Sequence, residues 1–195
     1  MHFFMDKVLS ILEPLFNYID GGKLFRQPFR ILYYVLGVVF GLGIIYGVTK
    51  YTLDTIHYLN GGAYVFAILM ILVVIASGVF TIIYWFKRAK LVGVDIPENA
   101  RFLAIPAISG FVIVFGEWLG LMIGVIGVCF GVLSAILLPI TGNGAEFFLT
   151  GLLMAVGAAI VGFINILFWR LIGEQILAIG SIANDCAEIR KNTAK

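Results

Sequence analysis

The chain has 195 residues, of which 62% are hydrophobic and only 12% are charged, and its formal net charge is +2. Soluble domains are about half apolar and about a quarter charged, so this composition excludes an ordinary soluble domain. It also gives no support to nucleic-acid binding. We predict an all-α, polytopic transmembrane helical bundle without a separate soluble domain.

The N-terminal stretch, residues 2–19, carries apolar side chains at helical spacing with polar side chains off the stripe. Asp6 and the interrupted apolar run argue against a signal peptide. The pattern predicts an amphipathic helix that lies in the membrane interface and forms an element over residues 1–22.

Four stretches are long and apolar enough to reach across a bilayer, which takes about 20 residues. They cover residues 31–49, 63–86, 102–140 and 147–169. We expect a four-span bundle over residues 23–176, with a loop at 50–62 between the first two spans, and a cytoplasmic helical tail over 177–195.

Lysine and arginine are distributed unevenly along the chain. Four precede the first span, four separate the second and third spans, four follow the last span, and only Lys50 lies in the other two connections. Because positive charge accumulates on the cytoplasmic side, four crossings place both termini in the cytoplasm.

The central stretch carries a stripe of small residues. Five glycines lie 4, 4, 3 and 4 residues apart, at Gly116, Gly120, Gly124, Gly127 and Gly131. The last span carries a second stripe at Gly151, Ala155, Ala158 and Gly162. Small residues allow close backbone approach between helices in lipid. A short turn joins the two spans, so we expect antiparallel neighbours that pack stripe against stripe.

The central stretch of about forty residues would be about 60 Å long as one helix, twice the hydrocarbon thickness. Trp85 and Trp169 lie at the basic ends of their spans, and Trp118 at the same level would give a crossing over residues 119–140. We therefore expect a separate apolar segment before Gly116, kinked at Pro106. The alternative is one long tilted helix with Glu117 inside it.

Glu117 is the only charged residue within the central stretch. An acidic residue in a membrane is by default a candidate for a proton relay, a cation site or an ion pair. We favour an interfacial carboxylate beside Trp118 that reaches headgroup water or a basic neighbour such as Arg170. Glu117 nevertheless remains the candidate ion or proton residue.

The sequence gives no sign of catalysis. Cys129 and Cys186 do not form a disulfide framework or a metal-binding spacing. Paired carboxylates, an intramembrane histidine cluster, a nucleophile with a histidine base, and a phosphate-binding loop are all missing from the sequence. We expect no enzymatic activity, no metal and no cofactor.

The segment after Trp169 continues a helical apolar pattern. Its members are Ile172, Ile176, Ile179, Ile182, Cys186 and Ile189, at intervals of 4, 3, 3, 4 and 3. Arg170 and Glu174 can pair at i,i+4. The pattern covers too few heptads to be called a coiled coil, and Gly180 weakens it. A surface helix against the bundle or the headgroups is the interpretation we favour.

The string RLIGEQILAIGSIANDCAEIRK in this tail resembles the closing segment of an uncharacterised bacterial membrane family, domain of unknown function 4282. The matching positions are Arg170, Leu171, Glu174, Ile182, Asn184 and Asp185. The resemblance implies a small bacterial inner-membrane protein and no known activity.

These observations favour a non-enzymatic membrane protein that acts by helix packing and assembly. It would be a homo-oligomer or an accessory subunit, with the lipid bilayer and a second copy or another membrane protein as partners. The alternative is an ion channel or small transporter that uses Glu117.

Overall fold

The computed structural model describes residues 23–59, 61–92, 104–141 and 144–193. This part of the chain contains four long α-helices, one short 3-10 helix and no β-strand. The elements are α2 (Lys23–Ile56), α3 (Gly62–Leu91), α4 (Ala104–Leu137), η1 (Leu138–Thr141) and α5 (Gly144–Thr193). The predicted N-terminal amphipathic helix lies outside the described residues.

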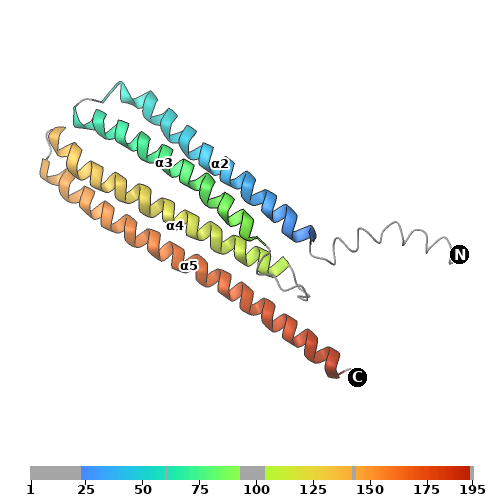
Figure 1. The fold of residues 1–195 in the computed structure, drawn as a ribbon. Coiled ribbons are helices and arrows are strands. Elements are labelled where there is room, and N and C mark those ends of the chain that lie inside the picture. Colours follow the sequence, from blue (N-terminus) through green and yellow to red (C-terminus); the bar gives the residue numbers. More distant parts are fainter. Residues whose placement is uncertain (1–22, 60, 93–103, 142–143, 194–195) are drawn as a thin grey trace, which may run out of the picture.

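The helices form two antiparallel hairpins placed side by side (Figure 1). One hairpin pairs α2 with α3, and the other pairs α4 with α5 over the most extensive interface of the molecule. The hairpins meet mainly through α3 and α4. All four helices are long and apolar enough to cross a membrane, so the prediction of a four-helix membrane protein is confirmed at this level.

Helix α4 runs without interruption from Ala104 to Leu137, so the predicted division near residue 116 is wrong. At 1.5 Å per residue this helix is about 51 Å long. Pro106 occupies its first turn, where backbone N–H groups have no intrahelical acceptor. A proline there starts a helix rather than kinking it, and Glu117 consequently lies in mid-helix.

Helix α2 also extends further than its predicted span, because it continues through Lys50 to Ile56. The predicted loop at 50–62 is therefore wrong for residues 50–56, which are helical. Gly61, directly before α3, has a φ of 57°, a positive value that glycine adopts readily.

Helix α5 has 50 residues and is about 75 Å long. It combines the predicted last span and the tail in one helix, with no break after Trp169. Its C-terminal end reaches beyond the ends of the other three helices (Figure 1). The tail therefore does not fold back along the bundle.

Candidate functional site

Glu117 lies between α4 and α3, and its side chain is 16% exposed. Its carboxylate forms an ion pair with Arg88 of α3, and the Tyr84 hydroxyl donates a hydrogen bond to its Oε2 atom over 3.0 Å. Tyr84 and Arg88 are four residues apart and share one face of α3. The Arg88 guanidinium also lies 5.5 Å from the centre of the Tyr84 ring, within cation–π range.

The basic neighbour suggested for Glu117 from the sequence, Arg170, is not its partner. Arg170 pairs instead with Glu174 over 3.4 Å on the surface of α5. The sequence contained a signal for the correct partner, because Thr81, Tyr84 and Arg88 recur at helical spacing along one face of α3. This polar face marks the side of α3 that meets α4.

Aromatic side chains fill the space next to this ion pair. Trp85 is fully buried and Trp118 is 6% exposed, with their ring centroids 5.9 Å apart. Phe40 of α2 stacks on Trp118 at 4.7 Å. Trp85 and Trp118 thus lie at one level but in the protein interior, where they join α2, α3 and α4.

The polar atoms inside this cluster are largely paired. The Trp118 indole N–H donates to the Thr81 hydroxyl oxygen over 3.0 Å, and the Thr81 hydroxyl donates to the Ser77 carbonyl oxygen over 2.8 Å. The Trp85 Nε1 atom is buried without a hydrogen-bond partner in the described part of the chain. Buried polar groups are normally paired. Of the two Thr81 bonds, only the one from Trp118 joins α4 to α3, and it adds to the Glu117 contacts in orienting the two helices.

The two small-residue stripes pack together in the α4–α5 hairpin. A Cβ atom added at Gly120 would lie 2.6 Å from the Gly162 carbonyl oxygen, and one added at Gly162 would lie 2.6 Å from the Gly120 carbonyl oxygen. A Cβ added at Gly151 would lie 2.6 Å from the Gly131 carbonyl oxygen. Separations below 3.0 Å do not occur for real Cβ atoms, so the backbones touch only because these residues are glycine.

The other glycines of the α4 stripe differ in the space around them. An added Cβ at Gly116 would collide with Trp169, and one at Gly127 would collide with Ala158. Gly124 is different, because an added Cβ there would meet no atom within 4 Å. It lines an apolar groove of 420 Å³ between α4 and α5 on the outside of the hairpin.

The close approach of α5 to α4 continues past Trp169, so the first part of the predicted tail lies against the bundle. The Ser109 hydroxyl donates to the Gly173 carbonyl oxygen over 2.6 Å, and an added Cβ at Gly180 would lie 2.7 Å from Ile105 Cγ2. These contacts fix the direction in which α5 leaves the bundle.

A cavity of 340 Å³ opens at the same end of the bundle as the ion pair. Its walls are mostly apolar and include Tyr33, Leu91, Ala107 and Leu177, with Arg88 as the charged lining residue. The cavity therefore lies beside Arg88, and Arg88 remains paired with Glu117.

The described residues contain no group of three histidine, cysteine, aspartate or glutamate side chains that could hold a metal ion. Cys129 and Cys186 are both free, and Cys186 is exposed. Comparison of the chain with protein-family models, with curated proteins and with solved structures finds no match.

Proposed function

We propose that this protein is a non-enzymatic membrane component that acts by assembly and uses the far end of α5 to bind a protein partner. The observation that carries this proposal is the exposure of three isoleucines on that end, namely 66% for Ile179, 62% for Ile182 and 62% for Ile189. Burying such a side chain contributes about 1.5–3 kcal/mol. The apolar part of α5, Glu146–Cys186, has 41 residues, about twice the length that a membrane requires. Its far end can therefore project from the bilayer, and exposed apolar side chains there are a feature of interaction surfaces.

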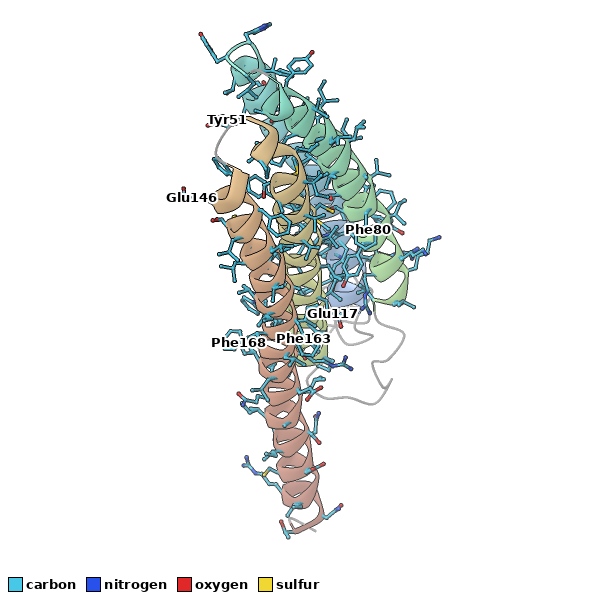
Figure 2. The ribbon with its side chains drawn as sticks, turned by 90° about the vertical axis from the view of Figure 1, so that its left-hand side faces the viewer. Tyr51, Phe80, Glu117, Glu146, Phe163 and Phe168 are labelled. Atoms are coloured by element: carbon cyan, nitrogen blue, oxygen red, sulfur yellow. The ribbon has the colours of Figure 1, made fainter. Side chains whose placement is uncertain are left out.

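The position of these isoleucines supports the proposal. In Figure 2, α5 continues below the level of Glu117, and its last turns have no other described helix beside them. Gly180 is the last glycine of α5, and it packs closely on Ile105 of α4. We call residues 181–193 together with Ile179 the α5 extension. Following the distribution of basic residues, the extension lies in the cytoplasm.

The body of the protein is suited to hold this extension rigidly. The interlocked backbones at Gly120, Gly131, Gly151 and Gly162 leave little freedom for α5 to rotate against α4. The Ser109 hydroxyl bond to α5 adds a directional contact at the base of the extension. A partner would therefore meet a helix with a fixed orientation, which lowers the entropic cost of binding.

The polar groups of the bundle give less support to ion conduction. The Glu117 carboxylate has both Arg88 and Tyr84 as partners, and the buried Thr81, Ser109 and Ser134 hydroxyls each donate to a backbone carbonyl. A channel or small transporter that uses Glu117 is the second candidate. It is favoured by the cavity that Arg88 lines beside the ion pair.

Two measurements separate these functions. In the first, the full-length protein is purified in mild detergent, and the particle size on native gels is compared with the size of its denatured monomer. In the second, the same preparation is reconstituted in liposomes, and ion and proton flux are measured. Assembly predicts a particle larger than the monomer and no flux. Migration as a monomer would contradict assembly, whereas flux that is lost in Glu117→Gln would establish the channel.

A further inference from the structure

The exposed side of the α5 extension has the spacing of a short coiled-coil seam. Ile179, Ile182, Cys186 and Ile189 are exposed and lie 3, 4 and 3 residues apart. This is the alternation of a and d positions in a heptad repeat. Gly180, which packs on α4, lies largely on the other side of the helix at about 100° per residue. The four side chains therefore face away from the bundle, and we call them the outer stripe.

The charges beside the outer stripe distinguish one partner from others. When Ile179 and Cys186 occupy a positions and Ile182 occupies a d position, Asp185 falls at g and Arg190 falls at e. Both charged residues are exposed. The outer stripe thus has an acidic residue on one flank and a basic residue on the other, and no charge within it.

A second copy of the same helix satisfies this arrangement only in parallel orientation. In a parallel pair, a g residue faces the following e residue of the other helix, so Asp185 of each copy would face Arg190 of the other. In an antiparallel pair, g faces g and e faces e, which would bring like charges together. The charges therefore select parallel, in-register pairing of two identical chains.

The membrane imposes the same orientation. Copies inserted with one topology carry their α5 helices in the same direction, so two extensions meet in parallel. A seam of about two heptads is too short to hold free peptides together. Here the extension is already helical as part of α5, and confinement to one membrane raises the effective concentration of the second copy.

We infer that the α5 extensions of two copies of this chain pair in parallel and in register through the outer stripe. This inference rests on the proposed function and adds the identity of the partner. In register, Cys186 of one copy lies opposite Cys186 of the second copy. Asn184 lies on the side of the helix away from the pair.

The position of Cys186 allows a direct test in the full-length protein. Cys129→Ala leaves Cys186 as the only cysteine, and membranes that contain this variant are treated with copper phenanthroline and analysed on non-reducing gels. The matched control carries Cys129→Ala, Cys186→Ser and Asn184→Cys. A disulfide requires Cα atoms within about 7 Å, so dimer yield at Cys186 should exceed that of the control at least about fivefold. Equal yields would overturn the inference.

A charge exchange tests the register independently. Asp185→Lys or Arg190→Asp alone brings like charges together and should lower the yield of the Cys186 dimer, while the double exchange should restore it. Failure of the double exchange to restore the yield would contradict pairing in register.

If no Cys186 dimer forms but the protein remains in a large detergent particle, pairing with a second copy is wrong and the proposed function stands. A monomer without a Cys186 dimer would contradict both.

Discussion

Gly120 and Gly124 are adjacent members of the same stripe, yet only the replacement of Gly120 by alanine should destabilise the protein. A Cβ at Gly120 would lie 2.6 Å from the Gly162 carbonyl oxygen, whereas ordinary contact begins at 3.4 Å. Relief of this contact requires α4 and α5 to separate by about 0.8 Å, and gaps of 0.5–1 Å forfeit about a quarter to a half of the dispersion energy of the atoms involved. We expect Gly120→Ala to destabilise the hairpin by about 1–3 kcal/mol.

Gly124→Ala is the matched control for this change. Its Cβ would enter the apolar groove and meet no atom within 4 Å. Alanine also favours the helix over glycine by about 0.5–1 kcal/mol. The expected result is unchanged or slightly increased stability. Both variants are measured by equilibrium unfolding in mixed micelles of mild detergent and dodecyl sulfate, and an equal loss of stability in the two variants would refute the assignment of the seam.

Three further changes test the contacts of the ion pair and of the hairpin. Glu117→Gln should lower the stability by about 1–3 kcal/mol, below the value for a fully buried pair because Arg88 is 35% exposed; a loss no larger in this variant than in a conservative surface variant would show that the pair is unimportant. Thr81→Val removes the acceptor of the Trp118 indole and should cost about 1 kcal/mol or more, whereas Thr81→Ser should retain most of the stability. Ser109→Ala should increase hydrogen exchange in the C-terminal third of α5, because it removes the side-chain bond at the base of the extension; unchanged exchange would argue against that bond as an anchor.

The sequence was sufficient to predict the features that depend on local pattern. Four apolar stretches gave the four spans, and the short turn after the central stretch placed Gly120 and Gly162 on neighbouring antiparallel helices. The spacing of glycines also indicated which face of α4 meets α5. It did not reveal that Gly124 points into an open groove, because this depends on the rotation of α4 within the interface.

The wrong predictions concern the kink at Pro106 and the partner of Glu117, which both depend on where residues lie in the folded protein. Pro106 predicted a kink only on the assumption that a helical turn preceded it, and α4 begins two residues earlier. Arg170 and Arg88 both lie at the basic ends of spans, so the sequence could not decide which one approaches Glu117. That choice follows from the packing of α3 against α4, which Thr81 and Trp118 fix.

The glycines of the two stripes pack against each other within one chain, and this limits which surfaces can join two copies. Gly120, Gly131, Gly151 and Gly162 are engaged within one chain, so they are not available as the contact between copies. Under the proposed function, assembly would depend instead on the exposed isoleucines of the α5 extension. This surface is separate from the seam, and each can be altered without touching the other.

The most direct test of assembly through the α5 extension is the protein mass of the detergent particle, measured by native mass spectrometry at matched concentration. The wild type should give a multiple of the monomer mass or a complex with a partner. The variant with Ile182→Glu and Ile189→Glu should give the monomer, and Ser181→Glu, which is exposed off the outer stripe, should match the wild type. A wild-type mass equal to that of the monomer, or the same particle mass in all three proteins, would contradict the account.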